Sequence, residues 1–206
     1  MNEQARAAVR GWQDTVNSIW DARVGPMGGA APAQSPPQSP PVDRGLTPEE
    51  IAIARSVFGN ELDTSKIKLT DDSLFPPNAV AFPNNIRFPR GELSGSADLR
   101  YRGWLVHELT HIWQYQRGHS VPQLALDATV GDYDFGGEDG LRKATAEGKR
   151  FGDFNFEEQG DILREYYRKR ELGEPISAFQ PFVDQVRFGT TDGIFPEPAP
   201  PLGPAI

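Results

Sequence analysis

Two of the three histidines in this 206-residue chain lie four residues apart, and a glutamate directly follows the first of them. The segment reads His107-Glu108-Leu109-Thr110-His111, an H-E-x-x-H pattern within a run that favours a helix. Four residues turn a helix by about 400°, so both imidazoles leave the same face one turn apart. Two ring nitrogens at that separation can reach one zinc ion at roughly 2.0–2.1 Å. Glu108 would then lie beside a zinc-bound water, where it can take the proton of that water.

The absence of cysteine limits the metal chemistry that this chain can perform. Thiolate zinc sites, iron–sulfur clusters, disulfides and cysteine nucleophiles are all excluded. Any transition-metal site must therefore be built from His, Asp and Glu. The alternative, that His107 and His111 are ordinary core residues, is less favourable, because buried polar side chains without partners are costly.

A hydrolytic zinc site takes three protein ligands and keeps a fourth position open, so a third ligand is needed. His119 is one candidate, but it follows the helix-ending Gly118 and does not have the spacing of the extended zinc motif. The stronger candidates are Glu157 and Asp161, which share one face of a predicted helix. One carboxylate can bind zinc while the other accepts the free ring N–H of a ligand histidine. We predict Glu157 as the ligand and Asp161 as the partner of that histidine.

Two parts of this prediction have alternatives. Glu158 is the other candidate ligand; adjacent helical residues point about 100° apart, so Glu157 and Glu158 cannot both face the metal. In that alternative Glu157 is a first-turn charge favoured by the helix dipole. The identity of the residue that donates a hydrogen bond to the oxyanion is also undecided, because tyrosines on a helix often serve in packing. The candidates for it are Tyr166, Tyr167 and His119.

The elements that must position these residues can be predicted from capping signals and apolar periodicity. Thr47, Pro48 and Glu50 have the pattern of a helix N-terminus. Residues 119–156 are rich in Gly and Asp and have little periodicity, so we assign no element to them. The overall pattern predicts an α+β fold. The expected helices cover about residues 48–58, 98–117, 157–172 and 179–186, and the expected strands cover residues 66–69, 80–82 and 86–88.

The chain divides by composition into four parts. Residues 1–24 have an apolar stripe at helical spacing; such a helix must dock on its own domain or on a partner, or act as a delivery tag. Residues 25–45 are a Pro-rich linker. Residues 46–190 form the folded domain, and residues 191–206 are a Pro-rich tail that we expect to be disordered.

Charge and hydropathy exclude several functional classes. The formal net charge of −8 argues against a nucleic-acid binder, which would need a basic face. No run of apolar residues is long enough for a membrane-spanning helix. The first residues contain no apolar segment of the kind found in Sec signal peptides, so we expect no export by that route.

The combination of H-E-x-x-H with a downstream helix bearing E-x-x-x-D resembles the gluzincin branch of the zincin-like metallopeptidases. The flanking segments are LTPEE at residues 46–50, NNIRF at 84–88, HELTHIWQ at 107–114 and FNFEEQGDI at 154–162. Together they are similar to the zincin peptidase domains encoded beside type VI secretion and other contractile injection loci, which often carry Vgr- or Rhs-related labels. This resemblance covers about residues 46–172. In those families Gln often stands where this chain has Glu158, and Ala where it has Gly160.

The resemblance implies a zincin-like fold, in which a small, mostly antiparallel sheet lies against an active-site helix and a second helix supplies the third ligand. It also implies Zn²⁺ as the cofactor and association with an injection apparatus. We expect a Vgr- or Rhs-type secretion partner that binds the N-terminal helix. The chain would then reside in the bacterial cytoplasm before delivery by a non-Sec injection system.

We therefore predict a zinc-dependent metallopeptidase that hydrolyses a peptide or protein substrate, acting as a secretion-associated effector or a processing enzyme. The alternative is a non-catalytic accessory or structural module of a type VI or contractile injection system, in which a metal only stabilises the fold. A third hypothesis is metal-assisted hydrolysis of a non-peptide bond, such as a deacylation. Glu108 discriminates between the first two, because a structural site needs no carboxylate base beside the water position.

Overall fold

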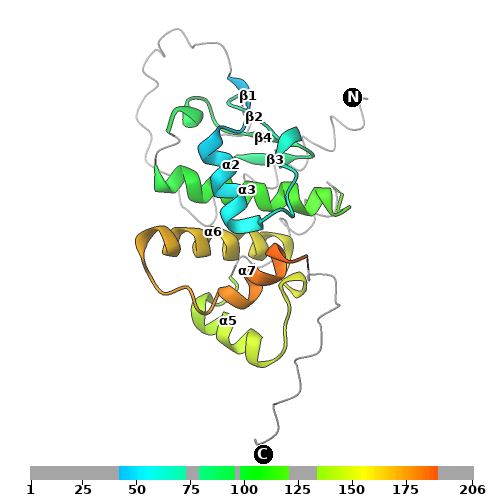
Figure 1. Cartoon of the computed structure of the whole chain (residues 1–206), viewed down its shortest axis with the longest axis vertical. Coiled ribbons are helices and arrows are strands. Elements are labelled where there is room, and N and C mark those ends of the chain that lie inside the picture. Colours follow the sequence, from blue (N-terminus) through cyan, green and yellow to red (C-terminus); the bar gives the residue numbers. More distant parts are fainter. Residues whose placement is uncertain (1–41, 73–78, 96–97, 121–133, 190–206) are drawn as a thin grey trace, which may run out of the picture.

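The computed structural model describes residues 42–72, 79–95, 98–120 and 134–189. Within these ranges the chain is an α+β domain with five α-helices and one four-stranded sheet (Figure 1). The strands are β1 (Asp43–Gly45), β2 (Lys68–Thr70), β3 (Val80–Phe82) and β4 (Asn85–Arg87), and the helices are α2 (Pro48–Phe58), α3 (Leu99–Gln116), α5 (Gly137–Ala146), α6 (Phe156–Leu172) and α7 (Gln180–Arg187).

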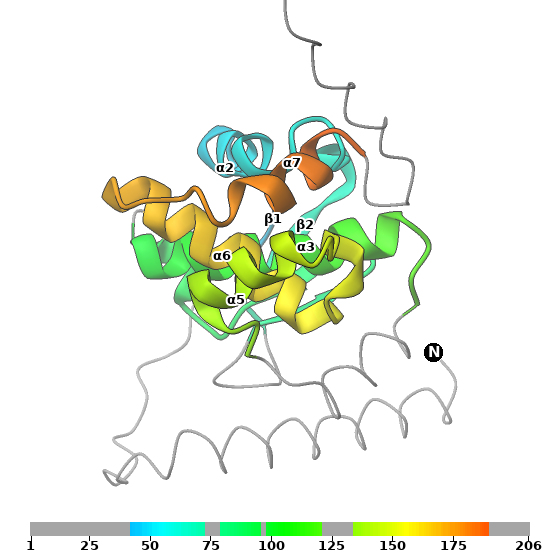
Figure 2. The same cartoon turned by 90° about the horizontal axis from the view of Figure 1, so that it is seen from below.

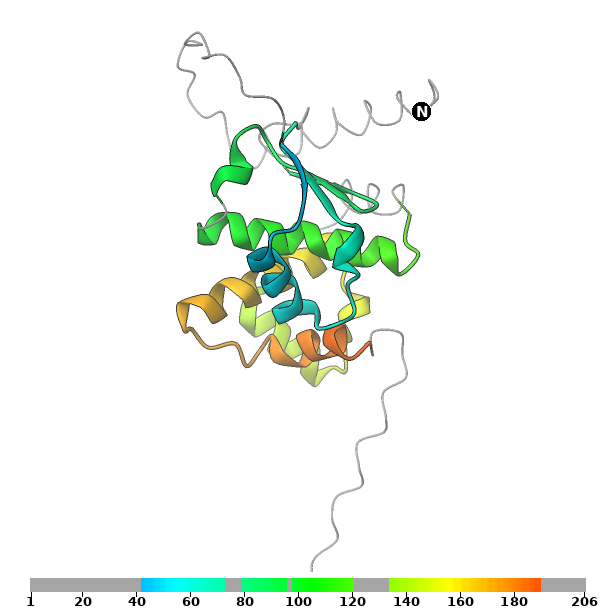
Figure 3. The same ribbon diagram turned by 45° about the horizontal axis from the view of Figure 1, so that its top comes forward.

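The long helix α3 lies at the centre of the layers. The sheet covers one side of α3, and α6 packs along the other side (Figure 3). Helices α5 and α7 lie beyond α6, as the view from below shows (Figure 2), and α2 contacts both α3 and α7. Helix α3 is therefore covered on both sides, and side chains between α3 and α6 are held away from water.

The sheet is mixed, with the strand order β1-β2-β4-β3. The pairs β1–β2 and β3–β4 are antiparallel, and the pair β2–β4 is parallel. The parallel pair arises because the β3–β4 hairpin places its second strand, and not its first, beside β2. Asn84 permits the tight hairpin by adopting a φ of 60°. The expectation of a mostly antiparallel sheet therefore holds for two of the three pairings.

The domain begins earlier than the sequence suggested. Residues 43–45, predicted as the end of the linker, form β1 and pair with residues 68–70. The side chain of Arg44 also makes two hydrogen bonds with Glu50, at 2.6 and 2.9 Å. The sequence did not predict this strand, because a strand of three residues is too short to show a recognisable alternation of apolar and polar residues.

Glu50 joins three elements in the interior. Its carboxylate accepts hydrogen bonds from Arg44, from the backbone N–H of Thr47 and from the hydroxyl of Tyr101, and only 1% of the residue is exposed. Burial alone would raise the pKa of Glu50, but these donors together lower it. The capping box predicted at the start of α2 is thus also the link between β1 and α3.

Helices α3 and α6 both begin at residues whose side chains cap the helix. Asp98 caps α3, and Asn155 caps α6 in a reciprocal capping box with Glu158. Helix α6 ends at Gly173, which adopts the left-handed φ of 71°. Helix α3 buries the apolar stripe of Leu105 and Ile112 in the core. These signals explain why the sequence predicted both helices nearly to the residue.

Helix α5 lies within residues 119–156, a segment to which the sequence assigns no element because it has little periodicity. The α5 segment begins with Gly136 and Gly137, both at positive φ, and carries another glycine at residue 140. Glycine weakens helix propensity, and only Leu141 and Ala144 of this helix are buried. The helix therefore depends on docking rather than on a periodic apolar face.

Some predicted segments lie outside the described residues: the N-terminal helix at residues 1–24, most of the linker at 25–45, and the tail at 191–206. Among the helices that are described, none has the length and apolar character needed to cross a bilayer.

Candidate metal centre

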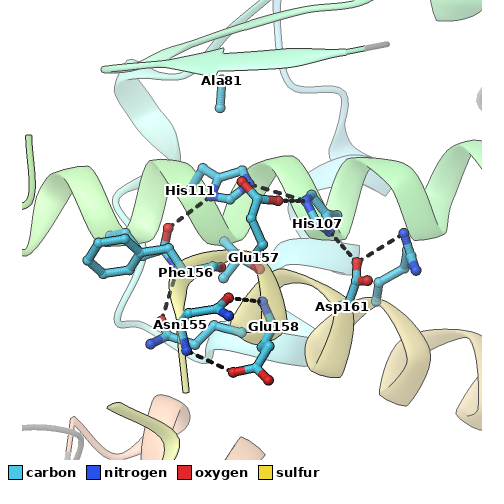
Figure 4. Close-up of polar contacts among 12 residues, drawn as sticks. Ala81, His107, His111, Asn155, Phe156, Glu157, Glu158 and Asp161 are labelled. Atoms are coloured by element: carbon cyan, nitrogen blue, oxygen red, sulfur yellow. Dashed lines mark hydrogen bonds and ion pairs between the residues drawn. The ribbon is translucent and has the colours of Figure 1, made fainter. Parts of the chain in front are cut away.

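Three metal-ligand side chains converge between α3 and α6 (Figure 4). The Nε2 atoms of His107 and His111 lie 3.1 Å apart. From α6, Glu157 places Oε2 at 3.2 Å from the Nε2 of His107 and Oε1 at 3.6 Å from the Nε2 of His111. All three residues are buried, each with at most 9% of its surface exposed. The structure thus brings together the two histidines and the glutamate that the sequence selected.

The distances between these atoms fit a zinc ion. In a tetrahedral site with bonds of 2.0–2.1 Å, ligand atoms lie about 3.3 Å apart. The observed 3.1, 3.2 and 3.6 Å lie around that value. Two imidazoles and one carboxylate also leave one tetrahedral position open, which is the donor set of hydrolytic rather than structural zinc sites.

The charges around the two histidines favour a cation at this place. Burial opposes the charged form of His107, but the carboxylates of Asp161 and Glu157 outweigh burial and raise its pKa to about 10. Burial likewise opposes the charged form of Glu157, but His111 and His107 lower its pKa. The site therefore stabilises positive charge at the position where the ring nitrogens meet the carboxylate.

The carboxylate of Asp161 contacts Nδ1 of His107, the ring nitrogen that faces away from His111 and Glu157. Its Oδ1 atom lies 2.9 Å from Nδ1 of His107 and 3.1 Å from a guanidinium nitrogen of Arg164. This contact turns Nε2 of His107 toward Glu157 (Figure 4). Asp161 thus has the location predicted for a carboxylate that orients a ligand histidine.

Glu158 occupies a different position from Glu157. Its side chain accepts a hydrogen bond from the backbone N–H of Asn155 at 3.0 Å, and its own N–H donates to Asn155 Oδ1 at 2.8 Å. The carboxylate of Glu158 is thereby engaged in capping α6 and points away from the two histidines (Figure 4). Of the two adjacent glutamates, only Glu157 approaches the ring nitrogens.

Glu108 lies on α3 between the two histidines and is 5% exposed. Burial raises the pKa of its carboxyl, while positive charge on His107 and His111 lowers it. A buried carboxylate with a raised pKa is a better proton acceptor near neutral pH than an exposed one. Glu108 is thus a buried carboxyl group on the same helix as both histidines.

The three candidate oxyanion donors lie in different environments: two are in the core and one is at the surface. Tyr166 and Tyr167 belong to the hydrophobic core, at 2% and 1% exposure. The hydroxyl of Tyr166 accepts a hydrogen bond from Arg187 at 3.0 Å. His119 is exposed, and its ring packs on that of Phe156, the residue before Glu157, with 4.6 Å between the ring centroids. Tyr166 and Tyr167 lie on α6 itself, more than two turns beyond Glu157, whereas His119 follows the end of α3 and packs next to the start of α6.

Three further residues of the site escaped the sequence prediction. Tyr115 follows His111 by one helical turn and donates a hydrogen bond to the carbonyl of Ala81 at 3.2 Å. Gln114 contacts His111, with Oε1 2.9 Å from Nδ1. Gly160 lies so close to His107 that a Cβ atom would be 2.7 Å from Cε1 of the ring. Helical spacing from His111 could have identified Tyr115 and Gln114, but Gly160 follows only from the packing of α6 on α3.

The fold and the site together define an α+β domain with a buried His-His-Glu group of metal-ligand type. No protein-family model matches the chain. The chain is 35% identical, over an alignment of 140 residues that covers 64% of its length, to the type VI secretion system spike protein VgrG2b of Pseudomonas aeruginosa. The chain spans only 14% of the length of that protein. It is thus similar to one limited segment of VgrG2b.

A solved structure of the effector domain of Pseudomonas aeruginosa VgrG2b is also similar. The two sequences are 29% identical, and the match covers 90% of this chain and 98% of that domain, with a TM-score of 0.48.

Proposed function

We propose that this chain is a zincin-like, zinc-dependent metallopeptidase domain associated with a type VI secretion system. The observation that carries the proposal is the convergence of the His107, His111 and Glu157 ligand atoms at tetrahedral spacing, with the buried carboxylate of Glu108 on the same helix. A zinc ion held by these three residues supplies Lewis acidity, which lowers the pKa of water toward neutrality and polarises a carbonyl group.

The chain's own residues have separate tasks in this proposal. His107 and His111 offer neutral nitrogens, and Glu157 offers one carboxylate oxygen. The carboxylate of Asp161, 2.9 Å from Nδ1 of His107, favours a proton on that nitrogen and keeps the ring in its ligand orientation. Glu108 takes a proton from the attacking water and delivers it to the leaving amine. A metal ion held at this place would oppose the effect of burial on the pKa of Glu108, and its carboxylate would remain available as a base.

The position of β3 favours an extended peptide as the substrate. Among the described strands, β3 is the last in the sheet order and has one edge without a strand partner. The hydrogen bond from Tyr115 to Ala81 places that strand against the helix that carries the histidines, and Ala81 lies above them in Figure 4. An extended chain can add to a free strand edge through backbone hydrogen bonds. This arrangement supports peptide-bond cleavage over the deacylation hypothesis.

The similarity to a spike protein supports association with a secretion apparatus and delivery by a non-Sec route. It is also the observation that favours the second candidate function, a non-catalytic accessory module of that apparatus. In the accessory module zinc would stabilise the packing of α3 on α6, and Glu108 would have no chemical task.

The test measures zinc content and cleavage of a complex peptide mixture for wild type, Glu108→Gln and Glu158→Gln. We expect Glu108→Gln to keep zinc and to lower turnover at least about a hundredfold, the usual scale for a lost general base. Glu158→Gln is the matched control on α6 and should retain both zinc and activity, because Gln can still serve in the capping box. Near wild-type activity of Glu108→Gln would disprove the mechanism. Zinc binding without any cleavage by wild type would favour the accessory module.

A further inference from the structure

A chain of buried amide groups leads from the start of α6 to His111. The Nε2 of Gln159 donates to the carbonyl of Phe154 at 2.8 Å. The Oε1 of Gln159 accepts from Nε2 of Gln114 at 2.9 Å, and the same Nε2 donates to the carbonyl of Phe156 at 3.1 Å. The Oε1 of Gln114 then lies 2.9 Å from Nδ1 of His111. Gln114 is fully buried, and Gln159 is 4% exposed. We call these two glutamines the amide relay.

The direction of every hydrogen bond in the amide relay is fixed by the two backbone carbonyls at its base. A carbonyl oxygen can only accept, so Gln159 must turn its NH₂ group toward Phe154 and its oxygen toward Gln114. Gln114 must then present its NH₂ group to two acceptors, which leaves its oxygen facing His111. An oxygen acceptor at this place requires a proton on Nδ1 of His111. The lone pair of a neutral His111 is consequently on Nε2, the atom that faces His107 and Glu157.

We propose that Gln114 and Gln159 are positioning residues that fix the tautomer and ring orientation of His111 for metal binding. The proposal rests on the proposed function, since it assigns the two glutamines a task only if His111 binds zinc. The relay does for His111 what Asp161 does for His107, but with neutral groups.

A neutral partner suits His111 because negative charge is already concentrated at this place. Glu108, Glu157 and Asp161 are all buried, each at 9% exposure or less. Another buried carboxylate behind His111 would add repulsion and a further desolvation penalty. An amide oxygen orients the ring without that penalty. The donors of the relay are in turn satisfied by Phe154 and Phe156, so no buried polar group of the relay is left without a partner.

The relay also joins the two ligand-bearing helices. Gln114 belongs to α3 and Gln159 to α6, and the Phe156 carbonyl that the relay holds adjoins Glu157. Orientation of His111 and placement of Glu157 are therefore set by the same group of hydrogen bonds. Loss of the relay should weaken metal binding even though all three ligands remain.

The test measures zinc affinity by competition with a chromophoric chelator for wild type and three variants. Gln114→Leu should weaken zinc binding by about ten- to a hundredfold, the range for lost partners of ligand histidines. Gln159→Leu should have a smaller effect in the same direction, because Gln114 keeps its bond to Phe156. The matched control is Gln116→Leu, on the same helix, whose side chain bonds Asp63 at the surface. The control should bind zinc like wild type.

A second readout distinguishes orientation of His111 from general loss of stability. In zinc-loaded wild type and in Gln116→Leu, NMR should show a slowly exchanging ring N–H from Nδ1 of His111, and Gln114→Leu should lose it. Wild-type affinity and a retained N–H signal in Gln114→Leu would overturn the proposal. If Gln114→Leu does not fold, wild-type affinity and a wild-type N–H signal in Gln159→Leu would overturn it equally. A wild-type chain that binds no zinc refutes the proposed function itself, and the task assigned to the relay with it.

Discussion

Replacing Gly160 with alanine should weaken zinc binding while leaving the free energy of unfolding of the metal-free protein nearly unchanged. Gly160 lies inside α6, where alanine is intrinsically more favourable than glycine by about 1 kcal/mol. A Cβ atom at this position would lie 2.7 Å from Cε1 and 2.8 Å from Nδ1 of His107. Carbon atoms in contact prefer about 3.5–4.0 Å, so the ring must move by roughly 1 Å.

A displacement of that size is large for a metal ligand. Ligand distances in metal sites stay within about 0.2 Å of their ideal values. Movement away from Gly160 would also disturb the 2.9 Å contact of His107 with Asp161. Ala often stands at this position in the families that the chain resembles, so the prediction depends on the close packing of α6 on His107 in this chain. We expect the zinc affinity of Gly160→Ala to fall at least about tenfold, which corresponds to about 1.4 kcal/mol. In the metal-free protein the ring can turn aside, and the gain in helix propensity offsets the remaining strain. Its free energy of unfolding should stay within about 1–2 kcal/mol of wild type.

The assay compares chelator competition for zinc with urea unfolding of the metal-free protein. Gly103→Ala is the control: Gly103 lies inside α3, and a Cβ there would meet the flexible side chain of Arg168 at 3.2 Å. This control should gain stability or remain neutral, and it should bind zinc normally. If Gly160→Ala binds zinc as tightly as wild type, His107 does not bind the metal in the orientation described, and the reasoning is refuted.

Two further predictions concern the ligand set. Glu157→Ala should lose most of its zinc on dialysis while Glu158→Ala keeps it, because only Glu157 approaches the ring nitrogens; mass spectrometry reads the zinc content, and the reverse pattern would exchange the two assignments. In the metal-free protein the raised pKa of His107 contributes stability that is complete below its unfolded value of 6.5 and is lost as the pH rises through about 10. Urea unfolding with a chelator present should therefore show stability declining from pH 6.5 to 10, whereas zinc affinity should rise over the same interval as protons leave the ligands. A His107→Ala variant should lack most of that decline, and an equally steep decline in this variant would contradict the assignment.

The sequence predicts most directly those relations that depend on a single helix. The spacing of His107 and His111, and that of Glu157 and Asp161, translates directly into shared helical faces. Capping residues such as Asn155 mark the helix ends by local hydrogen bonds. These relations need no knowledge of how the helices pack.

What the sequence did not show depends on contacts between distant segments. Helix α5 has three glycines near its start and a narrow buried face, so its formation follows from docking and not from its own periodicity. Strand β1 is recognisable only through its partner β2. The task of Gln159 depends on Gln114 from another helix, and no spacing rule connects them. The need for a glycine at residue 160 becomes evident only from the packing of α6 against His107.

The short strand β1 also determines how mechanical load would enter the domain. A pull applied through the chain upstream of Asp43 acts first on three residue pairs with β2 and on the ion pair between Arg44 and Glu50. From there, force reaches α3 through the hydrogen bond of Glu50 with Tyr101, near the start of that helix. The ligand histidines lie further along α3, and Glu157 lies on α6. We therefore expect the pairing of β1 with β2 and the ion pair of Arg44 with Glu50 to break under tension before the contacts among the candidate metal ligands do.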